Sequence, residues 1–162
     1  YNKVTNRCRK AIKSNLTFSL AQKESGKKEA YELIKTNRVR QGRKIRMSFE
    51  DLMMVNNKIP VDFFQVFDTD GSTVGSSVAY RGSDNIIQAI FMGDDLNKRD
   101  LGAIDFLYMN IYNHYKELGY KYIDFGTSSL NGEPNIGLLR FKEIHNCKSS
   151  LQYTFCWTPD LE

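Results

Sequence analysis

The sequence predicts an α+β fold, close to the α/β class, with a mixed, mostly antiparallel sheet covered by helices on both faces. Residues 61–92 hold three runs rich in β-branched and aromatic side chains, separated by short polar turns. Residues 104–118 carry one apolar stripe at helical spacing, and a further apolar run at 120–125 follows it. Antiparallel strands followed by a β-α-β unit are typical of such a mixed sheet.

Two elements are expected at the start of the chain. Residues 5–14 predict a short basic helix, with Thr5 in the N-cap position. Residues 16–20 alternate apolar and polar side chains, which is the period of a half-buried strand.

Two further helices are expected before the central strands. The first spans residues 25–41, has its inner face at Ala30, Leu33 and Ile34, and ends at Gly42. The second spans residues 48–57 and begins with Ser-Phe-Glu-Asp, which resembles a capping box.

The central strands form a β-meander. We expect them at Val61–Phe67, Thr73–Tyr80 and Ile86–Met92. The turn at 68–71 and the connection at 81–85 are short, so strands that are neighbours in the sequence should pair antiparallel.

The clearest helix pattern follows the meander. Its apolar residues recur at helical spacing: Ile104, Leu107, Tyr108, Ile111, Tyr112, Tyr115 and Leu118. We expect Asp100 to cap the start of this helix and Gly119 to end it. The strand at Tyr120–Phe125 should return parallel to the strand before the helix.

The last elements are a polar loop at 126–132, a short helix at 135–144 and a closing strand at Leu151–Trp157 that buries Cys156. In sheets of this kind ligands bind where neighbouring strands diverge at their carboxyl ends. We therefore expect two strands to part after Met92 and Phe125, opening a slot that is edged by backbone N–H groups.

The composition is globular, with 41% hydrophobic and 26% charged residues, and no apolar run approaches the roughly 20 residues of a membrane span. The three cysteines are scattered and lie apart from both histidines, so we expect a reducing, cytoplasmic compartment and no metal site. The 162 residues predict a single domain. Because the chain starts with Tyr1 rather than Met, we expect it to be a fragment of a longer one.

Positive charge gathers in the first 46 residues, which carry 14 basic and three acidic side chains, for a net +11. The rest of the chain carries a net −7. This asymmetry predicts an electropositive face. One functional hypothesis is therefore a non-catalytic module that binds RNA or another polyanion with strongly salt-dependent affinity. The residues expected to carry that binding are Arg7, Arg9, Lys10, Arg43, Lys44 and Arg46.

Two motifs resemble a known group of proteins. Residues 124–142, DFGTSSLNGEPNIGLLRFK, resemble the D-x-G-x-S strand end and N-x-G-L-x-x-F-K helix of the Fem-type branch of the GNAT acyltransferase superfamily. Residues 6–17, NRCRKAIKSNLT, are similar to the entry motif R-x-x-R-K-A-x-K-x-G-L of that branch. The element order matches from about residue 4 to 157. The resemblance implies a GNAT-like fold and the transfer of an acyl group to an amine.

The resemblance leaves the donor open. In most GNAT members the donor is acyl-CoA, whereas in Fem-type members it is aminoacyl-tRNA and the amine acceptor is a cell-wall precursor. Arg99 and Gly102 match the first two positions of the R/Q-x-x-G-x-G/A loop that binds the CoA pyrophosphate. Ile104 stands in the last position, where a β-branched side chain would crowd phosphates that approach the backbone.

The resemblance assigns substrate or donor binding to the terminal motif, at Gly126, Thr127, Ser128, Asn135, Gly137, Arg140 and Lys142. It implies that Lys142 contacts a phosphate of the acceptor. Arg140 is two positions away, on another face of the helix. For proton transfer we expect Asp124, which alternatively fixes the Gly loop through hydrogen bonds, and secondarily Tyr108, which alternatively belongs to the core. Backbone N–H groups suffice for the oxyanion.

Overall fold

The computed structural model describes residues 2–153, 155 and 157. The chain divides into two compact units, Tyr1–Thr127 (the main unit) and Ser128–Glu162 (the C-terminal unit). The elements of the main unit are α1 (Asn2–Lys13), β1 (Thr17–Leu20), α2 (Glu24–Arg40), α3 (Phe49–Asn56), β2 (Val61–Phe67), β3 (Thr73–Tyr80), β4 (Ile86–Asp94), the 3-10 helix η1 (Arg99–Leu101), α4 (Ala103–Glu117) and β5 (Tyr122–Asp124).

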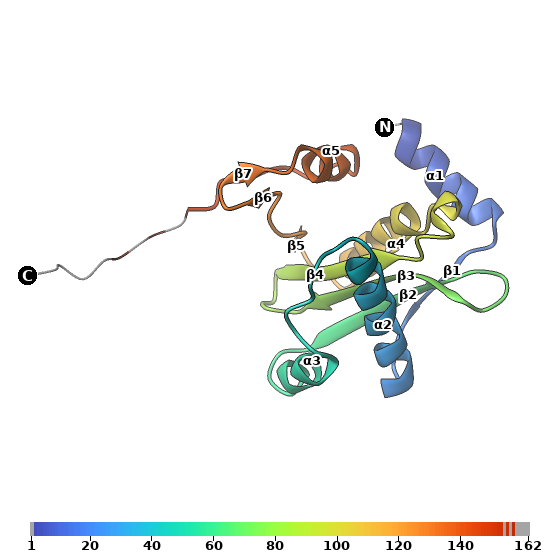
Figure 1. Ribbon diagram of the computed structural model, residues 1–162, viewed down its shortest axis with the longest axis horizontal. Coiled ribbons are helices and arrows are strands. Elements are labelled where there is room, and N and C mark those ends of the chain that lie inside the picture. The colour runs from blue at the N-terminus through green and yellow to red at the C-terminus, as the bar shows by residue number, and fades with distance from the viewer. Residues whose placement is uncertain (1, 154, 156, 158–162) are drawn as a thin grey trace, which may run out of the picture. The chain divides into compact units, whose positions relative to one another are not determined.

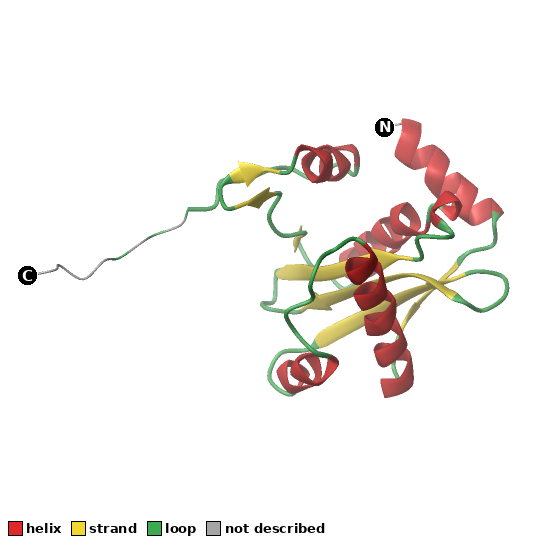
Figure 2. Cartoon of the chain, in the orientation of Figure 1, coloured by secondary structure: helices red, strands yellow, loops and turns green. Residues whose placement is uncertain are grey.

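The main unit is a five-stranded sheet in the order β1-β2-β3-β4-β5, with helices on both faces (Figure 1). All neighbouring strands pair antiparallel except β4 and β5, which are parallel. This confirms the predicted fold class. β2 and β3 have the predicted bounds, and Figure 2 shows the long meander that they form with β4.

Each face of the sheet has its own apolar core. Phe64, Leu107 and Ile111 belong to the core on the α4 side, whereas Phe63 and Ile34 belong to the core on the side of α2 and α3. Phe63 and Phe64 are consecutive in β2, so their side chains point to opposite faces and both are fully buried. A strand that is covered on both sides reads as a continuous apolar run rather than an alternating one.

The N-termini of two helices differ from the prediction. α1 begins at Asn2, so Thr5 lies inside the helix and does not cap it. α4 begins after Gly102, which has a left-handed φ of 74°, and Asp100 lies in η1 instead of capping α4. A left-handed φ is strained for a residue that has a Cβ, and this is why a glycine occupies the boundary. The capping box of α3 is confirmed, because the Asp51 backbone N–H donates to Ser48 Oγ and the Ser48 N–H donates back to Asp51.

The buried face of α4 also differs from the predicted stripe. Tyr112 and Leu118 are 59% and 51% exposed, whereas Phe106 is buried. α4 is covered by the sheet on one side and also packs against α1 (Figure 1). The first two turns of α4 are therefore buried on more sides than the rest of the helix, and the polar Asp105 is buried there as well.

The C-terminal unit contains a short hairpin and a helix. Its elements are β6 (Ser129–Leu130), β7 (Glu133–Pro134) and α5 (Ile136–Ile144). Asn135 is the N-cap of α5, because its Oδ1 accepts a hydrogen bond from the Leu138 N–H at 3.0 Å. The predicted strand at Leu151–Trp157 is wrong for the residues that the structure describes, since 151–153, 155 and 157 are not in a strand. Cys156 lies outside the described residues.

A buried charged cluster joins β2, the end of β3 and α4. The Arg81 guanidinium donates from Nε to Asp62 Oδ2 (2.6 Å) and from Nη2 to Oδ1 (3.0 Å), and the Tyr115 hydroxyl donates to Asp62 Oδ2 at 2.8 Å. Burial, reinforced by the Asp62 charge, raises the pKa of Tyr115, and the hydrogen bonds to Asp62 raise the pKa of Arg81. The two oxygens of Asp62 therefore accept hydrogen bonds from three donors.

We expect Tyr115→Phe to lower the free energy of unfolding by about 1–3 kcal/mol, because Asp62 loses a hydrogen bond inside the core. The matched control is Tyr112→Phe, which removes the same hydroxyl from an exposed position of the same helix. Urea denaturation of both variants measures the difference. Equal losses in the two variants would contradict the role given to the Asp62 cluster.

Candidate functional site

The parallel pairing between β4 and β5 is short, and the two strands separate well before β4 ends. Their parallel pairing runs only from Ile86↔Tyr122 to Gln88↔Asp124. β4 continues to Asp94, and its register with β3 skips Ile90, which forms a bulge. Because a bulge bends and twists the strand that carries it, β4 turns away from β5 at this point. The strands therefore diverge four residues before Met92 on β4, earlier than predicted, and close to the predicted Phe125 on β5.

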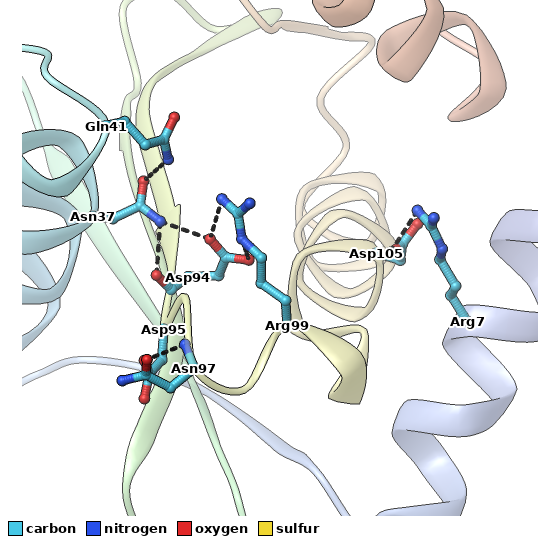
Figure 3. A network of polar contacts seen from close by, with 8 residues as sticks. All are labelled: Arg7, Asn37, Gln41, Asp94, Asp95, Asn97, Arg99 and Asp105. Atoms are coloured by element: carbon cyan, nitrogen blue, oxygen red, sulfur yellow. Dashed lines mark hydrogen bonds and ion pairs between the residues drawn. The ribbon is translucent and has the colours of Figure 1, made fainter.

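Asp94, the last residue of β4, is the centre of a polar network (Figure 3). The Asn37 side chain donates to Asp94 Oδ1 (2.6 Å) and to its carbonyl oxygen (2.7 Å). On the other side, Arg99 Nε lies 3.2 Å from Asp94 Oδ2. Gln41 donates to Asn37 Oδ1 at 2.7 Å, so the network joins the end of α2, the end of β4 and η1.

Asp94 and Asn37 were not among the site residues predicted from the sequence. Asp94 could have been found, because a carboxylate directly after an apolar strand lies at the edge where ligands bind in such sheets. Asn37 had a weaker signal. It falls three positions after Ile34 on the inner face of α2, where a polar side chain needs a hydrogen-bond partner.

Gly93 explains why α2 comes close enough to form this network. A Cβ at Gly93 would lie 3.1 Å from both the Asn37 Cβ and the Ile34 Cα. Only a residue without a side chain lets the helix backbone approach the strand at this distance. The amide of Asn37 then reaches Asp94, the next residue of β4.

The start of α4 is packed against α1. A Cβ at Gly102 would lie 3.0 Å from the Arg7 carbonyl oxygen, and Arg7 Nη1 lies 3.7 Å from Asp105 Oδ2 (Figure 3). Cys8 Sγ donates to the Asp105 carbonyl, and Lys10 pairs with Asp100. Of the loop predicted to bind phosphates, Arg99 has a 56% exposed side chain, whereas Gly102 is buried.

The two predicted proton carriers have different surroundings. Asp124 is exposed, and its Oδ1 accepts a hydrogen bond from the Gly126 N–H at 2.7 Å, so it holds the start of the following loop. Tyr108 is buried in α4, and its ring stacks on Phe125 with the centroids 4.4 Å apart. Tyr108 therefore lies against the residue that follows Asp124.

Most predicted binding residues of the terminal motif belong to the C-terminal unit. There the Asn135 N–H donates to the Ser128 carbonyl at 2.8 Å, while Gly137 lies in the first turn of α5. Lys142 is buried and Arg140 is exposed, which agrees with the expectation that they lie on different faces of α5. Gly126 and Thr127 end the main unit.

The cations of the predicted electropositive face divide into two sets. Arg7 and Lys10 on α1 are paired with carboxylates of η1 and α4. Arg43, Lys44 and Arg46 lie exposed between α2 and α3, and none forms a salt bridge within the described ranges. In the same part of the chain no group of three or more His, Cys, Asp or Glu side chains is placed to hold a metal ion, and no helix is long and apolar enough to cross a bilayer.

The structure is similar to several solved structures, two of them acetyltransferases by their names. It matches FemX with a TM-score of 0.73 and 12% identity over 88% of this chain, which spans about half (52%) of FemX. It also matches an acetyltransferase from Trypanosoma brucei (0.60; 14%; 88% of this chain and 99% of that one). A third match is a GNAT acetyltransferase from Elizabethkingia anophelis with acetyl-CoA bound (0.57; 15%; 81% and 74%). No protein-family model and no curated protein matches the sequence. These similarities show that the chain has the GNAT fold.

We expect Gly93→Ala to lower the free energy of unfolding by about 1–3 kcal/mol, since the added methyl group pushes α2 away from β4. Gly82→Ala is the matched control, because a Cβ there meets nothing within 4 Å and the effect should stay within about 0.5 kcal/mol. Chemical denaturation compares the two variants. If Gly93→Ala proves as stable as Gly82→Ala, the close approach of α2 to β4 does not contribute to the stability of the fold.

Proposed function

We propose that this chain, which has the GNAT fold, is an N-acyltransferase that moves an acyl or aminoacyl group from a phosphate-bearing donor to an amine. The observation that carries the proposal is the divergence of β4 from β5 beyond Gln88 and Asp124. It leaves one edge of β4, residues 89–94, without strand pairing in the part of the chain that the structure describes.

The unpaired edge of β4 suits the electrostatic requirement of acyl transfer. When an amine attacks an acyl carbonyl, negative charge develops on the carbonyl oxygen, and N–H groups that are already oriented stabilise it. Every second backbone N–H of a strand points to the same edge. The N–H groups of β4 beyond Gln88 that point away from β3 are therefore our candidates for donor and oxyanion binding.

Asp124 is our candidate for the proton transfer. One of its oxygens, Oδ1, is held by the Gly126 N–H, whereas Oδ2 forms no hydrogen bond or ion pair with another described residue. An exposed carboxylate that is fixed through one oxygen can accept a proton from an attacking amine through the other. Tyr108, packed beside Phe125, is the second candidate.

The surroundings of α4 bear on the donor. With α1 in place, the backbone of Gly102 and Ala103 is buried and the Asp105 carboxylate occupies the first turn, so this helix start does not fit the pyrophosphate of CoA. That favours the aminoacyl-tRNA donor implied by the Fem-type resemblance. The acetyl-CoA bound in the Elizabethkingia anophelis structure supports the other donor, and the assay below decides between them.

The acceptor is proposed to be an amine on a phosphate-bearing molecule, such as the cell-wall precursor implied by the Fem-type resemblance. The structural similarity to FemX supports this choice. Within the C-terminal unit, we retain Lys142 as the residue that binds the acceptor.

We expect the purified protein to acylate a primary amine when given acetyl-CoA or aminoacyl-tRNA, with the product detected by mass spectrometry. Asp124→Asn should lower kcat by about 10²–10⁴-fold because it removes the base. Asp84→Asn, an exposed carboxylate in the β3–β4 connection, should leave kcat unchanged. Strongly salt-dependent RNA binding without any transfer would instead support the non-catalytic module.

The donor and acceptor residues should separate in their kinetic effects. Arg99→Ala is expected to raise the KM for the donor, and Lys142→Ala the KM for the acceptor, each by roughly tenfold or more, as a lost charged hydrogen bond requires. Lys148→Ala, an exposed lysine beyond α5, is the control. A uniform change in both KM values would show that these residues act on the fold rather than on the substrates.

A further inference from the structure

Arg38, in the last turn of α2, is a half-buried arginine that forms no ion pair with a carboxylate of any residue that the structure describes. Its guanidinium carbon lies 5.1 Å from the centre of the Phe91 ring. Its Nε is buried and makes no hydrogen bond to any residue that the structure describes. Arg7, Arg81 and Arg99, by contrast, each lie beside a carboxylate.

The charge that affects the pKa of Arg38 belongs to another cation, Arg43. The Arg43 N–H donates to the Arg38 carbonyl at 2.9 Å, which folds the start of the α2–α3 connection back over the helix end. Burial, and then the Arg43 charge, lowers the pKa of Arg38. Two neighbouring cations, one of them partly out of water, repel each other unless an anion lies between them.

A structural role at the helix end does not explain this arrangement. A cation in the last turn does stabilise a helix by interacting with the dipole. Arg40 is in the same turn and provides that interaction from an exposed position. The dipole gives no reason for the Arg38 guanidinium to lie on Phe91 with a buried Nε that has no acceptor.

We propose that Arg38 and Arg43 form a subsite for an oxyanion, either a phosphate or a carboxylate. The rigid guanidinium fork binds both groups in a bidentate manner, and the Arg38 guanidinium lies over the Phe91 ring. Lys44 and Arg46 lie exposed within the same short stretch of the chain and raise the positive potential that draws an anion in.

The position of the subsite points to the acceptor, and this step rests on the proposed function. Phe91 lies on β4 beyond its last pair with β5, and it packs in the core on the side of α2 and α3. Arg99 belongs to the connection that enters α4, which covers the opposite face. The far part of β4 thus carries two cationic groups, Arg38 over Phe91 and Arg99 beside Asp94, as two anionic substrates require. The acceptor amine is therefore expected to carry a phosphate or a carboxylate of its own.

Inorganic phosphate and acetate test the subsite without any enzyme assay. We expect phosphate to raise the midpoint of thermal unfolding in a saturable manner relative to chloride at equal ionic strength. Arg38→Gln should weaken the apparent affinity for phosphate roughly tenfold or more, as the loss of a charge-assisted pair implies. Arg43→Gln, in an exposed loop, should weaken it too and leave the fold intact. Arg40→Gln, the matched control, should bind phosphate like the wild type. Saturation by acetate instead of phosphate would identify the carboxylate.

The outcomes separate the subsite from the enzyme activity. Equal responses of Arg38→Gln and Arg40→Gln, or no saturable response of the wild type, overturn the subsite. Phosphate binding without any acyl transfer keeps the subsite and refutes the proposed function. If transfer occurs and Arg38→Gln raises the KM of neutral and anionic acceptors equally, the assignment of the subsite to the acceptor is wrong.

Discussion

The course of β4 sets the geometry of everything that surrounds the candidate site. Its first three residues pair with β5, and the bulge at Ile90 then turns it away from β5. Further along, Gly93 admits α2 to the face of the strand, and Asp94 receives the side chains of Asn37 and Arg99 at its end. One strand thus provides an unpaired edge, a close helix contact and an anchored cation within nine residues.

The arginines of the main unit differ in burial and in pairing. These two properties separate arginines that stabilise the fold from one that can bind a ligand. Arg81 is fixed to Asp62 inside the fold, and Arg99 is fixed by Asp94 while much of its side chain stays in solvent. Arg38 is partly buried and lacks such a carboxylate among the described residues. A cation that is already paired contributes to stability, whereas one that is oriented but unpaired is ready to bind a ligand.

Local patterns predicted the fold well where neighbours in the sequence determine it. The bounds of β2 and β3 and the capping box at Ser48 depend on alternation, turns and short-range hydrogen bonds. The exposure of Tyr112 could not be predicted, because it depends on which sides of α4 are covered by α1 and the sheet. The location of the site near the ends of the strands stays a prediction. The pairing of Asp94 with Asn37 could not be predicted, because it joins residues 57 positions apart and leaves no local pattern.

The Asp62 cluster lies at the end of β3 that is remote from Asp94, because Gly75 near the start of β3 pairs with Asp94 and Arg81 follows its last residue. It ties β2, β3 and α4 together through a shared carboxylate. The sheet is therefore tied together by a shared carboxylate at each end, Asp62 at one and Asp94 at the other. Each end thus depends on one acidic side chain, and removing either carboxylate releases its own set of elements.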